Sequence, residues 1–463
     1  MDSSHLHSLT TSLEPHHVEL RLRPIEGTPP VASTEAELAE VAASLSTGWG
    51  PLAVDTERAS AYRYDDRVFL LQLRRSGAGT FLIDAEATRE YLGILGAVIN
   101  PLTWIIHAAP SDLPALAAAG LFPARLFDTE LAGRLIGVTK VNLAALTEQF
   151  LGVGLAKGHG REDWSQRPLP AEWLDYAALD VELLIDLAEV LGQALAELGR
   201  LEWLEQECSR ILLDYARFHA GLDIERHWQN LKGVKALRQR IQTQLASALW
   251  TEREAIAKAR DINPASVLPH KVIIDIARET PRTRQQLAAV KGFPRRRRGA
   301  TNQWWQVIST ALAEPEEQWP EPIARTPSAT GPQKKDWAAL APAAAALYDA
   351  AYSAITAIAA ELGLAQDTVT TTTQLRELVW WWHSGAVAKQ KSFPRASYGD
   401  ALAPYLELVH KCQQLGLSLW RAELVAGTLA AQVRLTYRYP AGVAGNSPSV
   451  AEARRSLPRG ASD

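Results

Sequence analysis

The sequence predicts an α/β domain followed by two all-helical domains. Apolar runs of strand length alternate with helical patterns from about residue 20 to 150, whereas beyond residue 205 the strand signals disappear and Ala, Leu, Gln and Glu become frequent. The chain has 463 residues, which corresponds to about three domains at roughly 150 residues each. With 47% hydrophobic and 22% charged residues, most of the chain has the composition of a folded globular protein.

Four apolar runs are expected to form the sheet of the α/β domain: residues 52–57, 68–73, 80–83 and 104–107. The first three follow one another with short connections, so they are expected to form an antiparallel meander. A helix over residues 86–98 precedes the fourth strand, and the sheet is therefore predicted to be mixed. Helical patterns follow over residues 112–119, 129–136, 143–151, with Gly152 as a C-cap, and 171–198.

The helical half contains a degenerate repeat at an offset of about 100 residues. The matching pairs are Ser266-Val267-Leu268 with Thr368-Val369-Thr370, and Gly292-Phe293-Pro294-Arg295 with Ser392-Phe393-Pro394-Arg395. Residues 314–335 lie between the two copies, and their five prolines are typical of a linker. The predicted organisation is a disordered tail (1–22), the α/β domain (23–222), a first helical domain (223–313), the linker (314–335), a divergent second helical domain (336–440) and a second disordered tail (441–463).

Charge and cysteine content limit the possible functions. The formal net charge of -4 excludes a general positive surface, so any nucleic-acid binding must be local. The two cysteines are too few and too far apart for a disulfide framework or a cysteine-based zinc site, which favours a reducing cytoplasm. The N-terminus lacks a signal-peptide pattern and no later run is expected to approach a membrane span, so we expect an unexported protein without membrane contact.

Asp55 and Glu57 form the first candidate for a chemical site. Side chains alternate along a strand, so both acids project to the same face at the end of an apolar run. Two acids in one small space repel each other unless cations lie between them, and Mg²⁺ prefers such oxygen ligands. The alternative for this motif alone is a solvated pair beside a loop.

Two further candidates follow along the chain. Asp112 stands where a strand ends and a helix begins, a position that also suits an ordinary capping residue. Tyr176 and Asp180 lie four residues apart, on one face of a helix, which by itself is an ordinary amphipathic pair. The three motifs in this order on one α/β domain are much more specific than any one of them.

With these motifs the sequence resembles the DEDD 3'-5' exonucleases and, among them, the ribonuclease D family, over roughly residues 23 to 440. Further similar segments are Trp104-Ile105-Ile106-His107, Phe127-Asp128-Thr129 and Asp163-Trp164-Ser165-Gln166-Arg167-Pro168-Leu169. The resemblance implies a ribonuclease H-like mixed sheet, tandem HRDC (helicase and ribonuclease D C-terminal) domains and the tyrosine subclass. It also implies that the metal-binding acids are Asp55, Glu57, Asp112 and Asp180, with Tyr176 as a further catalytic residue.

The implied chemistry is hydrolysis of RNA from a free 3' end, with trimming of stable RNA precursors such as tRNA as the implied role. Four carboxylates can hold two divalent ions, Mg²⁺ or Mn²⁺, roughly 4 Å apart, one activating a water and one stabilising the leaving 3' oxygen. Tyr176 is expected to orient the water. Asp128 is expected to be a helix N-cap, and His107 a packed residue at a strand end. The alternatives are an exonuclease acting on DNA and a catalytically silent nucleic-acid-binding protein, although retained acids without activity would be a repulsive liability.

Two groups of basic residues are candidates for contacts with RNA phosphates. Lys157, Arg161 and Arg167 lie in the loop before Tyr176, where solvation is an equally good explanation for each. Residues 281–298 hold seven basic residues and no acid, including Arg295, Arg296, Arg297 and Arg298, a run that suits backbone binding. The glycines near Lys157 follow a helix and lack the GK[ST] motif, so no nucleotide cofactor is expected.

Overall fold

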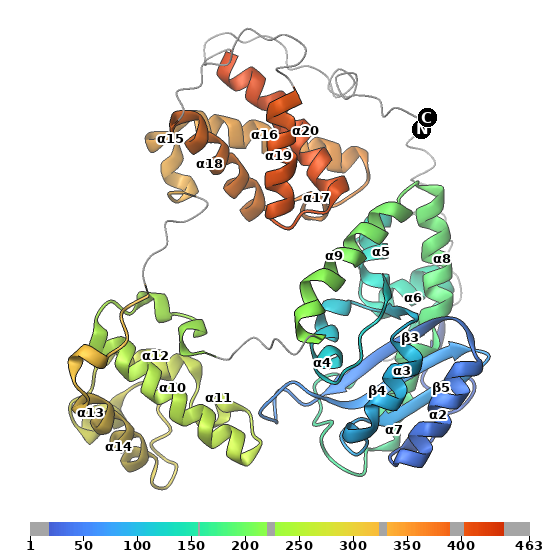
Figure 1. The fold of residues 1–463 in the computed structure, drawn as a ribbon, viewed down its shortest axis with the longest axis horizontal. Coiled ribbons are helices and arrows are strands. Elements are labelled where there is room, and N and C mark those ends of the chain that lie inside the picture. Colours follow the sequence, from blue (N-terminus) through green and yellow to red (C-terminus); the bar gives the residue numbers. More distant parts are fainter. Residues whose placement is uncertain (1–17, 156–157, 220–226, 324–330, 389–401, 439–463) are drawn as a thin grey trace.

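The computed structural model describes residues 18–155, 158–219, 227–323, 331–388 and 402–438, which form three parts (Figure 1). The α/β domain (residues 18–219) lies at the lower right of Figure 1, the first helical domain (227–323) at the lower left and the second helical domain (331–438) at the top. Lys157 and the predicted tail 441–463 lie outside the described residues.

The α/β domain is built on a six-stranded sheet with the strand order β2-β5-β4-β3-β6-β7. Its strands are β2 (Val31–Ala32), β3 (Trp49–Arg58), β4 (Val68–Ser76), β5 (Gly79–Asp84), β6 (Thr103–Ile106) and β7 (Arg125–Asp128). Strands β3, β4 and β5 pair antiparallel, whereas β6 is parallel to β3 and β7 is parallel to β6, so the predicted meander and the mixed sheet are confirmed. The prediction missed β2 and β7 because two and four residues are too short to show an alternating pattern.

A small second sheet pairs β1 (Glu19–Arg21) in parallel with β8 (Val153–Leu155). Residues 19–21 therefore form a strand within the segment 1–22 that the sequence predicts as a disordered tail. The sequence gives no sign of this strand, because its three residues are stabilised by a partner more than 100 positions away.

Helices cover both faces of the six-stranded sheet. Leu52 and Val54 of β3 belong to a core shared with α2 (Glu35–Thr47) and α3 (Leu92–Ile99). Ala53, on the opposite face, packs with Val181 and Leu184 of the helices α7 (Ala171–Glu182) and α8 (Leu184–Glu197). The remaining helices of the domain are α4 (Leu113–Ala118), α5 (Thr129–Ile136), α6 (Leu143–Leu151) and α9 (Leu201–His219).

Two predicted helices differ from the observed ones. The predicted helix 171–198 is divided at Leu183 into α7 and α8, because α7 packs on strands β3, β4 and β5 while α8 packs on α5 and α6. The predicted helix 86–98 begins only at residue 92 after a 3₁₀ turn, since the Asp84 carboxylate accepts hydrogen bonds from the backbone of Glu86 and Ala87 and holds a turn there.

The first helical domain has a hydrophobic core of its own, which includes Leu245, Leu249, Ile273 and Trp304. Its helices are α10 (Arg240–Arg260), α11 (Pro264–Val267), α12 (His270–Glu279), α13 (Arg284–Ala289) and α14 (Ala300–Ala313). Arg240 donates a hydrogen bond to the carbonyl of Trp319, which is buried. The first part of the predicted linker 314–335 therefore packs on this domain.

The second helical domain comprises α15 (Trp337–Leu340), α16 (Pro342–Glu361), α17 (Gln366–Val369), α18 (Thr372–Ala388), α19 (Leu402–Gln414) and α20 (Leu419–Arg438). At the first matching pair of the predicted repeat, both domains have a short helix followed by a longer one, α11 and α12 in one and α17 and α18 in the other. Val267 and Val369 are buried at equivalent places in these pairs. Residues 392–395 of the second matching pair lie outside the described residues.

The second helical domain packs directly on the α/β domain through one continuous hydrophobic core. Trp203 of α9 stacks on Trp420 of α20 with ring centroids 4.3 Å apart. The buried Arg200 donates hydrogen bonds to the carbonyl oxygens of Leu135 (2.6 Å) and Leu362 (2.5 Å), at the C-terminal ends of α5 and α16. This arginine therefore joins the two domains by satisfying carbonyls that the helices themselves leave unpaired.

One helix in the described parts of the chain, α16, is long and apolar enough to cross a membrane by length and composition alone. The prediction that no run approaches a membrane span is wrong in this respect. In the fold, α16 buries Leu347, Ala351 and Ile355 in the core of the second helical domain, and a core helix passes the same test.

Candidate active site

The carboxyl ends of β3 and β6 bring the predicted acids to one edge of the sheet. The two strands are parallel, with Leu52 paired to Trp104 and Ala53 to Ile105, so both run toward the same edge. Asp55 and Glu57 stand at the end of β3, and Asp112 follows β6 at the start of α4. Helix α7 crosses the same face and adds Asp180.

Asp55, Glu57 and Asp180 form a carboxylate cluster in which one oxygen from each residue lies within 4.8 Å of the others. Glu57 and Asp180 are buried, and Asp55 is half-buried. Such a group of convergent anionic oxygens matches the ligand set of a hard divalent cation. The structure thus brings together three of the four acids predicted from the sequence.

Asp112, the fourth predicted acid, lies beside this cluster and is buried. Thr56 donates a hydrogen bond to one of its oxygens at 2.6 Å, and Ser111 donates to the other at 2.7 Å. The Asp112 carboxylate makes no capping hydrogen bond to α4, so Asp112 is not an ordinary helix-capping residue. Its charge nevertheless acts on the cluster, because it helps to raise the pKa values of Asp55 and Glu57.

The pKa values of the acids reflect burial and mutual repulsion. Burial, followed by the neighbouring charges of Asp180 and Asp112, raises the pKa of Glu57 to about 8. Burial raises the pKa of Asp180 to about 7, and burial with the charges of the other acids holds the pKa of Asp55 well above its usual range. Ionised together, these groups repel one another, so a divalent cation among them would relieve both the repulsion and the desolvation.

Tyr176 lies on α7 one turn before Asp180, as predicted, and its interaction with the Asp180 carboxylate lowers the pKa of that acid against the larger effect of burial. Burial and the surrounding carboxylate charges raise the pKa of the phenol, so the proton stays on the hydroxyl at neutral pH. Gly158 passes so close that a Cβ atom there would come within 2.6 Å of the Tyr176 hydroxyl oxygen. Only a glycine leaves room for the tyrosine ring at this point of the loop.

Arg58 is a cation of the site that the sequence interpretation missed. Its Nη1 donates to Asp66 and to the carbonyl of Ser111, each at 2.8 Å, and its Nη2 lies 3.6 Å from an Asp112 oxygen. This charge lowers the pKa values of Glu57 and Asp112 against the larger effect of burial. Its position directly after Glu57 could have predicted this role, because a basic residue next to paired acids at a strand end compensates their charge.

Asp128 and His107 have the structural roles that the sequence suggested. The Asp128 carboxylate caps α5 by accepting hydrogen bonds from the backbone of Glu130 and Leu131. It also accepts from the backbone of Ala108 and Ala109, which lead to Asp112, and so fixes the loop between β6 and α4. His107 is hydrogen-bonded to Thr129 at 2.9 Å, and burial lowers its pKa to about 4.

The basic residues of the loop before α7 differ in their surroundings. Arg161 is exposed, whereas Arg167 donates hydrogen bonds to the carbonyls of Trp164 (2.7 Å) and Phe69 (3.0 Å) and to Asp84 (2.8 Å). Arg167 thus fixes the loop to the sheet, and the geometry does not favour its predicted contact with phosphates. Lys157 lies outside the described residues.

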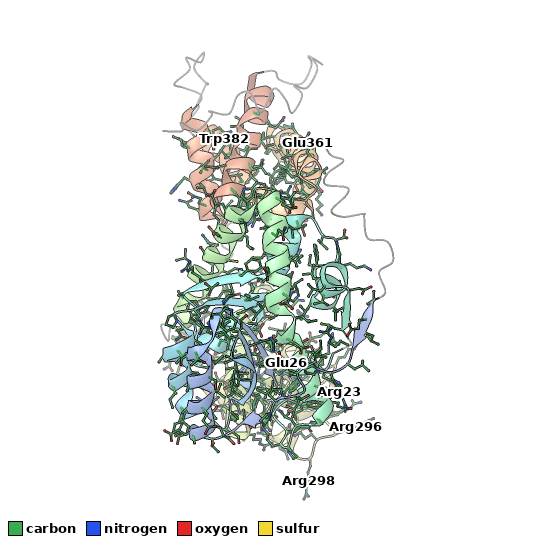
Figure 2. The ribbon with its side chains drawn as sticks, turned by 90° about the vertical axis from the view of Figure 1, so that its right-hand side faces the viewer. Arg23, Glu26, Arg296, Arg298, Glu361 and Trp382 are labelled. Atoms are coloured by element: carbon green, nitrogen blue, oxygen red, sulfur yellow. The ribbon has the colours of Figure 1, made fainter. Side chains whose placement is uncertain are left out.

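Arg295, Arg296, Arg297 and Arg298 are all exposed in the turn between α13 and α14. Figure 2 shows Arg296 and Arg298 projecting from the end of the molecule opposite Glu361 and Trp382. The four guanidinium groups are therefore accessible to a nucleic-acid backbone, as the predicted contact requires.

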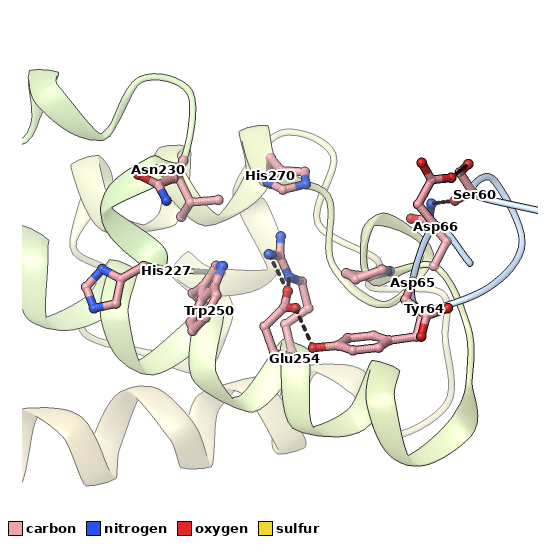
Figure 3. A pocket seen from close by; sticks show the side chains of 13 residues that line it. Ser60, Tyr64, Asp65, Asp66, His227, Asn230, Trp250, Glu254 and His270 are labelled. Carbon is pink, nitrogen blue, oxygen red and sulfur yellow. Dashed lines mark hydrogen bonds and ion pairs between the residues drawn. The ribbon is translucent and has the colours of Figure 1, made fainter. Parts of the chain in front are cut away.

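A polar joint connects the β3–β4 hairpin to the first helical domain. The Tyr64 hydroxyl donates to Glu254 at 3.1 Å, and Arg67 donates to Asp261 at 2.8 Å. Beside these contacts lies a pocket to which the hairpin contributes Asp65 and Asp66, and the helical domain His227, Asn230, Trp250 and His270 (Figure 3). The joint places the first helical domain next to the strand that carries Asp55 and Glu57.

Three family models match this chain. The model "3'-5' exonuclease" matches residues 30–196 and "HRDC domain" matches residues 242–308. Residues 330–397 match the model "3' to 5' exonuclease C-terminal domain", so the second helical domain matches a different model from the first. The predicted exonuclease domain and the first of the two predicted HRDC domains are thereby confirmed.

The chain is similar to curated proteins named ribonuclease D. The protein from Acidiphilium cryptum is 31% identical over 288 residues, which cover 61% of this chain and 71% of the relative. The protein from Zymomonas mobilis is 29% identical over 268 residues, covering 57% and 67%, respectively.

Two solved structures share the arrangement over most of their length. A protein from Bifidobacterium adolescentis is 29% identical with a TM-score of 0.73, covering 90% of this chain and 99% of that one. Escherichia coli RNase D, described as an exoribonuclease involved in structured RNA processing, is 23% identical with a TM-score of 0.63, covering 88% and 98%. This second likeness concerns the fold.

Proposed function

The chain belongs to the ribonuclease D family and is a 3'-5' exoribonuclease, and we propose that it trims the 3' ends of structured RNA precursors, those of tRNA included. The observation that carries the site assignment is the carboxylate cluster of Asp55, Glu57 and Asp180, with Asp112 beside it. The relatives act as ribonucleases by name, which favours RNA over DNA as the substrate. The cluster also argues against a silent binding protein, because unused buried acids would only destabilise the fold.

The exonuclease family uses divalent metal ions, and we propose that the four acids hold two of them, Mg²⁺ or Mn²⁺. The donor set fits, since each acid offers anionic oxygen and the raised pKa values show how much the ionised cluster needs a counter-charge. When bound, such ions supply Lewis-acid activation of water and stabilisation of the leaving oxygen.

The side chains of the site then have separate tasks. Asp55, Glu57 and Asp180 would hold the cations, and Asp112, whose oxygens accept hydrogen bonds from Thr56 and Ser111, would complete the ligand set. The Tyr176 hydroxyl, which keeps its proton, orients the attacking water. The water oxygen bonds to phosphorus, the P–O3' bond breaks, and the 3' oxygen takes up a proton, so each turn of the reaction releases a nucleoside 5'-monophosphate.

Arg161 and the exposed arginines 295–298 are proposed to contact phosphates of the RNA upstream of its 3' end. We also propose a cytoplasmic location, which agrees with the bacterial origin of the relatives and with two cysteines that are free and buried.

The test is a hydrolysis assay with 5'-labelled and 3'-labelled RNA and matched DNA, with Mg²⁺, with Mn²⁺ and with a chelator. We expect 3'-labelled RNA to release labelled mononucleotide at once and 5'-labelled RNA to shorten stepwise, only with metal. Asp180→Asn should be inactive under all conditions. Hydrolysis from the 5' end, equal rates on DNA, or activity in the chelator would each contradict the proposal.

A further inference from the structure

The loop of the β3–β4 hairpin and the first helical domain enclose a pocket that the proposed chemistry does not use (Figure 3). The cavity has a volume of about 360 Å³, which is within the usual range of small-molecule sites, about 300 to 1,000 Å³. The hairpin loop contributes Asp65 and Asp66 to its lining, and helix α10 contributes Trp250 and Arg253. We call this cavity the joint pocket.

Hydrogen bonds between the two domains fix the walls of the joint pocket. Asn263 donates from its side chain to the carbonyl of Ser60 at 2.6 Å and from its backbone N–H to the carbonyl of Tyr62 at 3.1 Å. The Tyr64 hydroxyl donates to Glu254 at 3.1 Å. Because both walls are held in this way, a ligand binds with little rearrangement of the protein.

The charged side chains of the lining are paired within the protein. Asp65 forms an ion pair with Arg67 at 2.7 Å, and Asp66 forms one with Arg58 at 2.8 Å. The buried Arg253 donates to the carboxylate of the next residue in α10 at 2.6 and 3.0 Å. Since each carboxylate of the lining has a cationic partner, the joint pocket offers no surplus charge to a phosphate or a metal ion, and a neutral ligand fits it better.

Two aromatic side chains of the first helical domain line the joint pocket. Trp250 is half-buried and His227 is exposed, and their ring centroids lie 6.2 Å apart. Asn230 and Asn263 add amide groups to the same lining. Aromatic faces next to amide donors and acceptors suit a nucleobase, because a base stacks on its face and forms hydrogen bonds at its edge.

The joint pocket lies next to the catalytic acids. Arg58 connects the two sites, because its Nη1 donates to Asp66 of the pocket at 2.8 Å and its Nη2 lies 3.6 Å from an Asp112 oxygen. The hairpin loop also continues directly from β3, which carries Asp55 and Glu57 at its end. An RNA strand whose 3' end lies at the acids therefore passes close to the joint pocket.

We propose that the joint pocket binds one base of the RNA strand upstream of its 3' end. The base turns out of the strand and stacks on Trp250 and His227, while its sugar and phosphates stay in solvent. The inference rests on the proposed function, which supplies the RNA strand and places its 3' end at the acids. Stacking on an aromatic ring tolerates every base, so the joint pocket holds the strand without selecting its sequence.

The test compares intact single-stranded RNA with RNAs that each lack the base at one internal position. Binding to the full-length protein is measured by fluorescence anisotropy in a chelator, in which the proposed function expects no hydrolysis. For the wild type, loss of the base that occupies the joint pocket should weaken binding about fivefold or more, the usual contribution of a base stacked on an aromatic ring. For Trp250→Leu, intact RNA should bind more weakly, and loss of the same base should weaken it no further.

Trp305→Leu is the matched control, because Trp305 is also half-buried against the core of the first helical domain but does not line the joint pocket. This variant should keep the wild-type difference between intact and abasic RNA. His227→Ala, at an exposed position, should reduce the difference, and it replaces Trp250→Leu if thermal unfolding shows that the tryptophan variant does not fold.

Equal wild-type affinity for intact RNA and for every abasic RNA overturns the inference, as does an undiminished abasic loss in a folded Trp250→Leu variant. If free adenosine or uridine binds the wild type but not Trp250→Leu and no abasic position matters, the ligand is a free nucleoside and the RNA strand is overturned as its source. If the wild type with metal shortens RNA from the 3' end but shows no abasic effect, this inference fails and the proposed function stands. If the abasic effect is present but RNA is not shortened, the proposed function fails instead.

Discussion

The phenol of Tyr176 interacts with the carboxylate of Asp180, one helical turn further along α7, and this interaction lowers the pKa of Asp180 against the larger effect of burial. The phenol oxygen packs closely on Gly158, so the tyrosine is held between the helix and the loop. A protonated hydroxyl next to a carboxylate of the proposed metal site suits the orientation of a water molecule better than proton abstraction.

Removal of this hydroxyl by Tyr176→Phe should slow the chemical step while leaving metal and RNA affinity nearly unchanged. Orientation of a reactant can contribute several kcal/mol, and about 1.4 kcal/mol corresponds to tenfold in rate, so we expect a loss of at least tenfold. Single-turnover kinetics at saturating Mg²⁺ measures it. Tyr91→Phe, at an exposed tyrosine in front of α3, is the control. An unchanged rate for Tyr176→Phe would leave the residue a packing role alone.

Asp55→Asn should abolish turnover and at the same time raise the melting temperature of the metal-free protein near pH 8. Burial and the charges of Asp112, Asp180 and Glu57 raise the pKa of Asp55, so the ionised Asp55 destabilises the folded state and a neutral Asn does not. Mg²⁺ should raise the melting temperature of the wild type more than that of the variant, because the variant has lost an anionic ligand. Thermal unfolding with and without Mg²⁺ gives all four values, and an equal Mg²⁺ effect on both proteins would remove Asp55 from the metal site.

The raised pKa values also predict how stability depends on pH. Glu57 titrates at about 8 and Asp180 at about 7 in the folded protein, against ordinary values of 4.5 and 3.8. Between the ordinary and the raised pKa values, the folded state binds more protons than the unfolded state. The contribution of Glu57 and Asp180 to the free energy of unfolding therefore falls as the pH rises. The melting temperature of metal-free Asp180→Asn minus that of the wild type should therefore grow between about pH 5 and pH 8. A difference that is independent of pH would contradict the raised values.

The polar joint between the α/β domain and the first helical domain predicts a local effect of Asp261→Asn. Asp261 accepts hydrogen bonds from Arg67 at 2.8 Å and from the backbone N–H of Tyr64 at 3.3 Å. Asp261 is more than one third exposed, so we expect a loss of only about 1 kcal/mol, with faster hydrogen exchange at the Tyr64 amide. Asp214→Asn, in the exposed ion pair with Arg210, should change neither quantity. Unchanged exchange at Tyr64 in Asp261→Asn would show that the joint does not hold the hairpin.

Replacement of Arg295, Arg296, Arg297 and Arg298 by Ala should weaken binding of long RNA and flatten its salt dependence. Each lost phosphate contact is expected to reduce the slope of log K against log salt by roughly 0.7 for single strands. Binding of AMP should stay unchanged, since the mononucleotide occupies only the active site. The double variant Lys232→Ala, Lys235→Ala removes two exposed charges of the same domain as a control. An unaltered slope in the arginine variant would show that the exposed turn does not touch RNA.

The placement of three of the candidate acids could be predicted from the sequence because they belong to local patterns, whereas their role as metal ligands came from the resemblance to the DEDD exonucleases. Alternation along a strand puts Asp55 and Glu57 on one face, and helical spacing does the same for Tyr176 and Asp180. The cap by Asp128 and the C-cap at Gly152 are local as well, and both are confirmed. Patterns of this kind depend on neighbours within a few residues, which is why they survive without knowledge of the fold.

What only the tertiary structure decided are the contacts between residues far apart in the chain. Arg167 donates hydrogen bonds to the Phe69 carbonyl and the Asp84 carboxylate, which lie more than 80 positions away in the chain. The sequence of the loop around Arg167 could therefore not predict these partners. The strand at residues 19–21 exists because β8 pairs with it, and the stack of Trp203 on Trp420 joins the second helical domain to the core. The sequence by itself thus determined where most helices and strands lie and on which face the acids project, because these properties depend on short-range periodicity. Hydrogen bonds and burial between distant segments decided which charged side chains stay accessible and which stabilise the fold.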